Sequence, residues 1–421
     1  MGNLCRAIVK KMTIKMSGNK ILSIDDSDVF FSYTDFWRTP TEGENGKYQG
    51  ISPPSVDVVV AIWTISLACP GNENSPPLDD ATRKRYEIFD LFRVKTPAFL
   101  SNYKNPCWKQ DNKLVCLSYF YQIGFPKCGS TLTFTTIVGH PEAAMGVRKE
   151  PQWFARRRFK EHTSYQNYLD YFLPAARVIQ SKSSTDSVTG QKFHPIITGS
   201  CNWLYLPWNY NCTEPRVLIP HYIHHLNPFA KVIIVIRKLL MISMYTFLTP
   251  GDITTESFHA RTVHDLATFE DCCSKHSLRF SLLVKKNPSP DLSSPLLFNG
   301  LAYLLQMVRV GLYHVFIRDW MKVFPADQIL VVRLEDIRGD LYRAFTRIFD
   351  FLGLSHVSRS ELKEIIHKSD MNGRKQKFQA MNETRRLLDD FYRPHNIQLA
   401  RLLRQHDPNS YSNIDDAMYS H

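Results

Sequence analysis

Four stretches of apolar, β-branched and aromatic residues stand out along the chain and predict buried strands: 116–123, 195–199, 231–236 and 328–334. The run Lys-Val-Ile-Ile-Val-Ile at 231–236 is continuous rather than alternating, as expected for a strand covered on both faces. Helical patterns lie between and after these runs, at 131–138, 220–226, 239–247, 300–323 and 340–352. Strands that alternate with helices indicate an α/β fold with an open parallel sheet flanked by helices.

The N-terminal part of the chain has a different character. Residues 1–55 are polar and rich in turn-forming residues, and residues 70–80 are rich in Pro, Asn and Asp. We therefore divide the chain into an irregular N-terminal region, 1–85, and one α/β domain, 86–421. The apolar stretch 58–69 is shorter than the about 20 residues that a membrane-spanning helix needs, so no membrane anchor is evident.

The chain is basic, with a formal net charge of +12 over 421 residues. The net positive charge, taken by itself, is explained by a solvated basic surface. Part of it, however, is concentrated in one short stretch: Arg148, Lys149, Arg156, Arg157, Arg158 and Lys160. Such a cluster suits polyanionic ligands, and because no nucleic-acid-binding motif is visible we do not expect nucleic acid as a partner. The sequence leaves the oligomeric state open.

The nine cysteines contain no Cys-x2-Cys pair, which argues against a zinc site. Cys107 with Cys116, and Cys201 with Cys212, are close enough for short disulfide loops, and buried free thiols are the alternative. Glycosylation sequons at Asn211 and Asn382 would be usable only in the secretory pathway.

The segment from Gly124 to Thr131, Gly-Phe-Pro-Lys-Cys-Gly-Ser-Thr, links the first predicted strand to the first predicted helix. A strand, a glycine-bracketed loop and a helix N-terminus form an anion site, because unpaired backbone N–H groups converge there and the helix dipole adds positive potential. A nucleotide P-loop has lysine directly after its second glycine, but Ser130 stands there and Lys127 lies inside the loop. The loop is thus P-loop-like without being an NTPase loop, and a P-loop kinase is the weaker alternative.

This loop resembles the 5′-phosphosulfate loop of sulfotransferases, and its surroundings resemble the carbohydrate sulfotransferase 15 family in order from about residue 89 to about residue 403. The matching segments are Lys104-Asn105-Pro106-Cys107-Trp108, Tyr119-Phe120-Tyr121, Lys149-Glu150-Pro151-Gln152-Trp153, Arg156-Arg157-Arg158-Phe159, Leu330-Val331-Val332-Arg333-Leu334-Glu335-Asp336 and Asp390-Phe391-Tyr392-Arg393-Pro394-His395-Asn396.

The resemblance implies a sulfotransferase fold and a glycoprotein enzyme of the Golgi. The sulfate donor would be 3′-phosphoadenosine 5′-phosphosulfate (PAPS), without a metal. The acceptor would be a hydroxyl of a glycosaminoglycan such as chondroitin sulfate, at position 6 of N-acetylgalactosamine 4-sulfate.

Sulfuryl transfer needs a positive group at the leaving phosphate and a base for the acceptor hydroxyl. We assign the first role to Lys127 and the second to Glu150. The competing interpretation of Glu150 is an ion pair with Arg148 or Arg156, and His140 and His162 are alternative bases. The predicted donor-binding residues are Pro126, Lys127, Cys128, Gly129, Ser130, Thr131, Arg237, Tyr245 and Arg374, and the predicted acceptor-binding residues are Trp153, Arg156, Arg157 and Arg158. For Trp153, a place in the core is the alternative.

Arg237 follows the strand at 231–236, where a sulfotransferase arginine binds the 3′-phosphate. The family's serine eight residues later is replaced by Tyr245, and Ser243 would lie on a different helix face. This departure leaves a second hypothesis open, a catalytically weak glycan-binding protein on a sulfotransferase fold.

Overall fold

The computed structural model describes residues 12–16, 19–24, 90–125, 127–146, 149–154, 158, 163–185, 190–202, 218–238, 254–275, 278, 308–368, 379–407 and 411. The chain divides into two compact units, Met1–Asp80 and Ala81–His421. Within the first unit, β1 (Met12–Met16) and β2 (Asn19–Ile24) pair as an antiparallel hairpin in a region predicted to be irregular. The second unit contains all of the predicted site residues.

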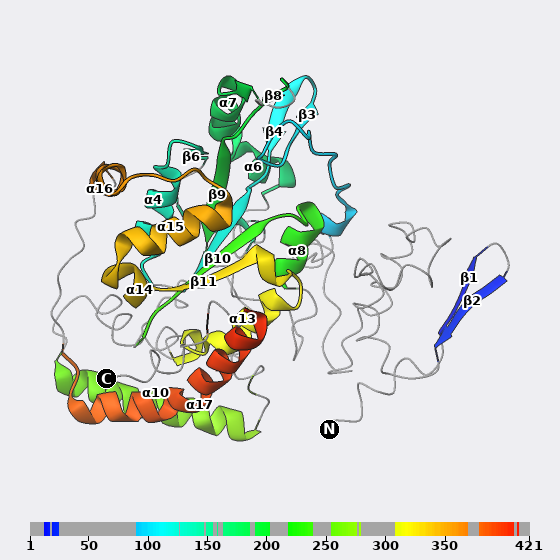
Figure 1. Cartoon of the computed structure of the whole chain (residues 1–421). Helices are drawn as coiled ribbons and strands as arrows, with labels where there is room; N and C mark the ends of the chain where they lie inside the picture. The colour runs from blue at the N-terminus through cyan, green and yellow to red at the C-terminus, as the bar shows by residue number, and fades with distance from the viewer. Residues whose placement is uncertain are drawn as a thin grey trace. The chain divides into compact units, whose positions relative to one another are not determined.

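A five-stranded parallel sheet forms the centre of the second unit (Figure 1). Its order is β11 (Ile329–Arg333), β10 (Lys231–Ile236), β5 (Phe120–Gly124), β9 (Ile197–Asn202) and β6 (Ala143–Ala144). From β5 the chain first builds β6 and β9 on one side and then crosses to build β10 and β11 on the other. The connections that follow β5 and β10 therefore diverge, and such a switch point is where open α/β sheets bind ligands.

Helices cover both faces of this sheet, as the alternating pattern predicted. Figure 1 shows α4 (Ser130–Val138) and α15 (Leu341–Leu352) on one side and α8 (Ile219–Leu226) on the other. Every residue of β10 after Lys231 is buried, which explains its uninterrupted apolar sequence. Other elements of the second unit are α6 (Tyr165–Asp170), α7 (Leu173–Ser181), α14 (Leu334–Gly339), α16 (Arg359–Lys368), the 3₁₀ helices η2 (Asp90–Arg93) and η5 (Ala326–Gln328), and the hairpin of β7 (Ser184–Thr185) with β8 (Lys192–Phe193).

The predicted strand 116–123 is two strands in the structure. Its first residue ends β4 (Lys113–Cys116), which pairs antiparallel with β3 (Cys107–Gln110), and the sheet strand β5 begins only at Phe120. The Asn105 amide separates them: its Nδ2 donates to the Leu117 carbonyl at 2.9 Å, and its Oδ1 accepts from the Thr198 N–H on β9 at 2.9 Å.

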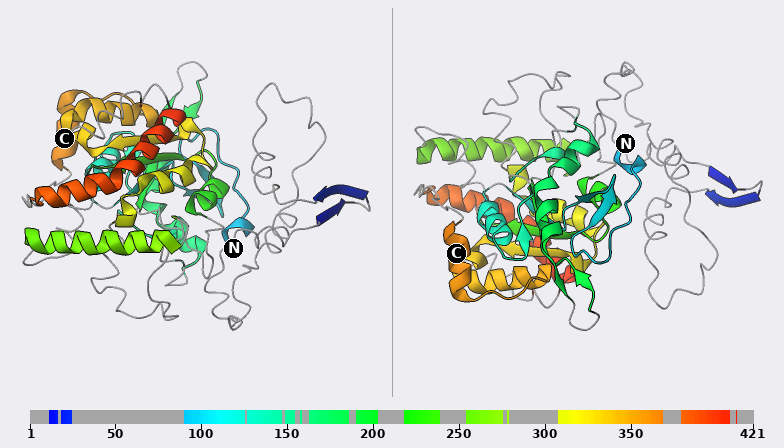
Figure 2. Two further views of the ribbon diagram at one scale, coloured as in Figure 1. Left: turned by 90° about the horizontal axis from the view of Figure 1, so that it is seen from below. Right: turned by 90° about the horizontal axis from the view of Figure 1, so that it is seen from above.

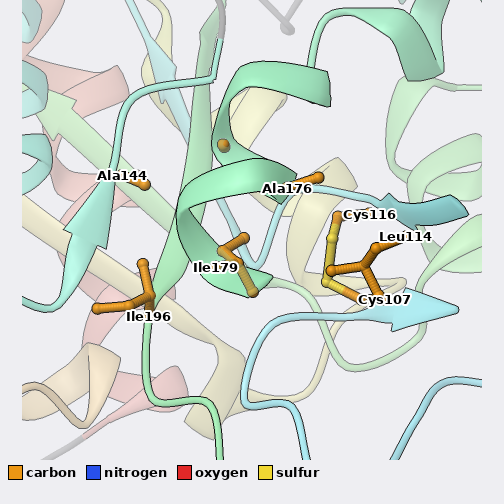
Figure 3. Close-up of a cluster of buried hydrophobic side chains, with 8 residues drawn as sticks. Cys107, Leu114, Cys116, Ala144, Ala176, Ile179 and Ile196 are labelled. Carbon is orange, nitrogen blue, oxygen red and sulfur yellow. A yellow bond between two sulfur atoms is a disulfide. The ribbon is translucent and has the colours of Figure 1, made fainter. Parts of the chain in front are cut away.

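A disulfide joins Cys107 to Cys116, which are register partners across the β3–β4 hairpin. It packs in a buried cluster with Ile179 of α7 and Ile196, so the hairpin is fixed to the domain core (Figure 3). Cys201, the other half-cystine candidate, carries a free buried thiol, and Cys212 lies outside the described residues.

Two helices far apart in the sequence lie side by side, α10 (Thr255–Lys275) and α17 (Asn382–His406) (Figures 1 and 2). The sequence pattern did not predict α10. The predicted helix 300–323 is interrupted at Gly311 and resumes as α13 (Tyr313–Met321). A Cβ on Gly311 would lie 2.7 Å from the Tyr392 ring, so a side chain does not fit at this position. Tyr392 also donates to the Val308 carbonyl at 3.1 Å, in keeping with a structural role for the 390–396 motif.

The predicted helix 239–247 lies outside the described residues. None of the helices that the structure describes is both long and apolar enough to span a membrane.

Candidate functional site

The loop between β5 and α4 has the backbone geometry of an anion cradle. Lys127 and Gly129 both adopt left-handed backbone, with φ of 63° and 83°. Gly129 is the N-cap of α4 and provides no capping side chain, so the first-turn N–H groups of the helix remain available to a ligand. Only glycine fits there, because a Cβ on Gly129 would lie 2.5 Å from Leu334 Cδ1.

The side chain of Cys128 faces the core rather than the ligand side. Its Sγ lies 3.5 Å from the Tyr313 hydroxyl of α13, and burial raises the pKa of Cys128 to about 12. The thiol is therefore neutral and is not a nucleophile at physiological pH. Any contribution of Cys128 to ligand binding comes from its backbone.

Arg237 closes the other side of the loop. It follows β10, whose Val235 is the register partner of Gly124, and its Nη1 donates to the Lys127 carbonyl at 3.1 Å. The Tyr313 hydroxyl donates to the Arg237 carbonyl at 3.0 Å, which fixes the arginine backbone against the loop. Burial lowers the pKa of Arg237, and the nearby positive charge of Arg338 adds to this effect. An anion beside the guanidinium would relieve both costs.

Leu334 and Glu335 bring α14 to the same edge of the sheet. Leu334 packs on Gly129, and Glu335 Oε1 accepts from the Lys238 N–H at 3.1 Å. The second contact gives Glu335 a structural role, since its carboxylate holds the backbone that follows β10.

Glu150 lies one strand away from the loop. Its N–H donates to the Cys201 carbonyl at the end of β9 at 2.8 Å, and Cys201 is the register partner of Gln122 on β5. Gln122 Nε2 in turn donates to the Ser130 carbonyl at the start of α4 at 2.9 Å. Because neighbouring strands are about 4.8 Å apart, these bonds bring the backbone of the predicted base to the same edge of the sheet as the phosphate loop.

The backbone around Glu150 is itself unusual. Glu150 and Gln152 have φ of 63° and 55°, and the intervening residue is Pro151. Left-handed conformations cost non-glycine residues of order 1–3 kcal/mol each and are concentrated at functional sites. The Glu150 carboxylate pairs with the Lys149 ammonium, and the side chains are 29% and 22% exposed. The predicted partners, Arg148 and Arg156, lie outside the described residues.

The structure does not support the acceptor-binding assignment of Trp153 and Arg158. Trp153 is 1% exposed and stacks on Tyr168 at a centroid distance of 4.8 Å. The Arg158 guanidinium, also buried, lies 4.5 Å from the centroid of the Tyr222 ring. Both residues belong to an aromatic core beneath the site, where cation–π contact stabilises the arginine.

His140, an alternative base in the sequence interpretation, is a structural residue. Its Nδ1 accepts from the Glu142 N–H at 3.1 Å, which leaves Nε2 to donate to the Ser355 carbonyl at 3.0 Å. The histidine is 2% exposed, and burial lowers its pKa. The other predicted site residues, Pro126, Arg156, Arg157, His162, Tyr245 and Arg374, lie outside the described residues.

Sequence reasoning missed three residues that organise the site, Gln122, Cys201 and Tyr313. Gln122 carried a signal, since it is the one amide in the apolar run that precedes the loop. Cys201 and Tyr313 act through contacts between distant parts of the chain. Among the residues that the structure describes, no cluster of three or more His, Cys, Asp or Glu side chains could hold a metal ion.

Comparison with known proteins shows the family of the chain. The sulfotransferase domain family matches residues 121–396, from β5 into α17, and the chain is a sulfotransferase. The human protein carbohydrate sulfotransferase 15 is 26% identical over 419 residues, which cover 83% of this chain and 72% of that protein. A protein of the same name from Nototodarus sloanii is 30% identical over 155 residues, which cover 35% of this chain and 88% of that protein. The chain belongs to the carbohydrate sulfotransferase 15 family.

Solved structures also align with the chain. A sulfotransferase from Alicyclobacillus acidocaldarius is 18% identical with a TM-score of 0.42, and the match covers 69% of this chain and 97% of that one. A mouse sulfotransferase complexed with PAP (3′-phosphoadenosine 5′-phosphate) is 12% identical with a TM-score of 0.37, and the match covers 71% of this chain and 98% of that one.

Proposed function

We propose that the protein transfers a sulfuryl group from PAPS to a hydroxyl of a sulfated glycosaminoglycan. The family resemblance favours position 6 of N-acetylgalactosamine 4-sulfate in chondroitin sulfate. The observation that carries the proposal is the convergence of three elements at the switch point of the sheet: the open N-terminus of α4, the Arg237 guanidinium and the Glu150 carboxylate.

The donor has two anionic ends, and the site offers a positive group for each. The 5′-phosphosulfate would lie in the loop, with the Lys127 ammonium and the first N–H groups of α4 against it. Arg237 uses one N–H on the Lys127 carbonyl, and its remaining donors can bind the 3′-phosphate. Arg237 would thus link the conformation of the loop to the binding of the nucleotide.

The chemical step is an in-line displacement at sulfur. The acceptor hydroxyl gives its proton to the Glu150 carboxylate as its oxygen bonds to sulfur, and the bond between sulfur and the bridging phosphate oxygen breaks. Lys127 and the α4 N–H groups stabilise the charge that grows on that oxygen. The products are the sulfate ester and 3′-phosphoadenosine 5′-phosphate (PAP).

We also propose that the protein works in the Golgi lumen. The Cys107–Cys116 disulfide supports this location, because such bonds persist in oxidising compartments.

The test is transfer of labelled sulfate from PAPS to chondroitin 4-sulfate by the purified protein and by Glu150→Gln. The amide has the carboxylate's shape but cannot take the proton, so kcat should fall about 10²–10⁴-fold while PAP affinity stays within about twofold. The control is Lys363→Met on α16, an exposed site with no predicted role in the reaction, which should behave as wild type. Full activity of Glu150→Gln would refute the assignment of the base, and absence of transfer by the folded wild-type protein would refute the proposed function.

A further inference from the structure

The ion pair between Lys149 and Glu150 is the feature of the site that the proposed chemistry leaves unexplained. Consecutive residues in a strand or helix point in different directions. Here the left-handed backbone at Glu150 turns its carboxylate back onto the preceding lysine. The ammonium therefore occupies an oxygen of the carboxylate that must accept the acceptor's proton.

The position of this pair is fixed by β9. The Glu150 N–H is bonded to the Cys201 carbonyl, and burial raises the pKa of the Cys201 thiol to about 12, with Lys149 opposing and Glu150 adding to that shift. Both charged groups are thus close to the end of β9, next to the strand that leads into the phosphate loop. Among the described members of the basic cluster at 148–160, Arg158 is buried and Lys149 is partly exposed.

A neutral acceptor would have to replace the Lys149 ammonium at the Glu150 carboxylate, and this exchange of an ion pair for a neutral contact is unfavourable. Its hydroxyl must approach the carboxylate, yet it offers nothing to the displaced ammonium. An acceptor with a sulfate beside the reacting hydroxyl would offer the ammonium a new anionic partner at the same moment. Partly exposed ion pairs contribute little to stability, so the exchange is accessible.

We propose that Lys149 determines specificity by binding a sulfate that the acceptor already carries next to the reacting hydroxyl. This inference rests on the proposed function. In N-acetylgalactosamine 4-sulfate, C4 and C6 are both attached to C5, so a carboxylate at the 6-hydroxyl and an ammonium bonded to that carboxylate can reach both groups. Binding of the sulfate releases Glu150 to accept the hydroxyl proton, and the in-line displacement at sulfur then proceeds.

The test compares chondroitin 4-sulfate with chemically desulfated chondroitin as acceptors. Both polymers carry uronate carboxylates, so a difference between them reports on the sulfate. Lys149→Met removes the charge and keeps the side-chain length, Lys149→Arg keeps the charge, and Lys363→Met is the matched control at an exposed position of α16. The kcat and KM of each protein are measured on both acceptors, and calorimetry gives acceptor affinity independently of turnover.

Lys149→Met should lose about 10–100-fold in kcat/KM on chondroitin 4-sulfate, mainly through KM, as expected for one charge-assisted hydrogen bond. Its kcat/KM on desulfated chondroitin should rise rather than fall, because this acceptor has no sulfate contact to lose and the Glu150 carboxylate no longer pairs with an ammonium. Lys149→Arg should retain most of the preference, and Lys363→Met all of it.

An unchanged preference in Lys149→Met, or an equal loss on both acceptors, would overturn this inference while the proposed function stands. Absence of transfer by the wild-type protein to either acceptor would overturn both.

Discussion

Replacement of Gly129 by alanine tests the geometry of the phosphate loop. Gly129 has φ of 83°, a region that costs an L-residue about 1–2 kcal/mol. The new Cβ would also lie 2.5 Å from Leu334 Cδ1, and overpacking of this kind costs about 1–3 kcal/mol. After a gain of about 0.4–1 kcal/mol from the less flexible unfolded chain, we expect Gly129→Ala to lose about 1–4.5 kcal/mol of unfolding free energy.

Two other glycines separate the contributions. Gly190 has φ of 67°, and a methyl group added to it would have no atom within 4 Å, so Gly190→Ala should show the backbone cost alone, about 1 kcal/mol. Gly339 has neither a left-handed backbone nor a close neighbour, so Gly339→Ala should be neutral or stabilising by up to about 1 kcal/mol.

Urea denaturation followed by circular dichroism gives these free energies, and calorimetry gives PAP affinity. Gly129→Ala should be the least stable of the three and should bind PAP at least about tenfold more weakly, because Leu334 or the loop must move. Leu334→Ala in the same chain removes the clashing atoms and should recover part of the PAP affinity, as a double-mutant cycle would show. If Gly129→Ala matches Gly190→Ala in stability and wild type in PAP affinity, the described loop is wrong.

Two further predictions concern stability. Burial lowers the pKa of His314 to about 4 in the folded protein, and the charges of His395 and Arg318 add to this effect. The pKa is about 6.5 in the unfolded state, so the unfolded state binds the proton first as the pH falls. The unfolding free energy should therefore fall as the pH drops from 6.5 towards 4, and this residue should account for about 2 kcal/mol of the fall at pH 5. Urea denaturation at pH 7 and pH 5 should show a smaller fall in unfolding free energy for His314→Gln than for wild type. An equal fall in the two proteins would exclude His314 as the cause. Removal of the disulfide by joint Cys107→Ala and Cys116→Ala should lower the unfolding free energy by about 2–3 kcal/mol for so short a loop, and no change would mean that the bond does not form in the protein.

The sheet was largely predictable from the sequence because its strands are buried on both faces. The run 231–236 is β10 residue for residue, and the Gly-rich loop with its following helix was found from local pattern alone. The prediction of one strand at 116–123 was wrong, because the chain leaves the β3–β4 hairpin and enters the sheet within this run. That break depends on Asn105, which lies outside the run and bonds to Leu117 and Thr198. α10 was missed because polar residues dominate its sequence, and its contact with α17, through Phe269 and Phe391 at a centroid distance of 5.9 Å, joins distant parts of the chain.

Some residues of the site were likewise predictable from the sequence and others were not. Arg237 and Lys127 could be identified because strand ends and a glycine-bracketed loop define their positions locally. The burial of Trp153 and Arg158 could not, since a cluster of aromatic and basic residues has the same sequence whether it faces solvent or core. The pairing of Lys149 with Glu150 depends on a left-handed backbone at a non-glycine residue, which residue type does not signal.

The measurement that tests the central claim most directly is calorimetric titration of PAP into the purified protein and into Arg237→Ala, with Lys363→Met as control. The account predicts saturable binding to wild type and to the control, and a loss of at least about tenfold in Arg237→Ala, because a charge-assisted hydrogen bond to phosphate contributes about 1.5–3 kcal/mol. Circular dichroism would establish that all three proteins are folded. Absence of PAP binding to the folded wild-type protein, or equal affinity in Arg237→Ala, would contradict a donor site formed by this loop and this arginine.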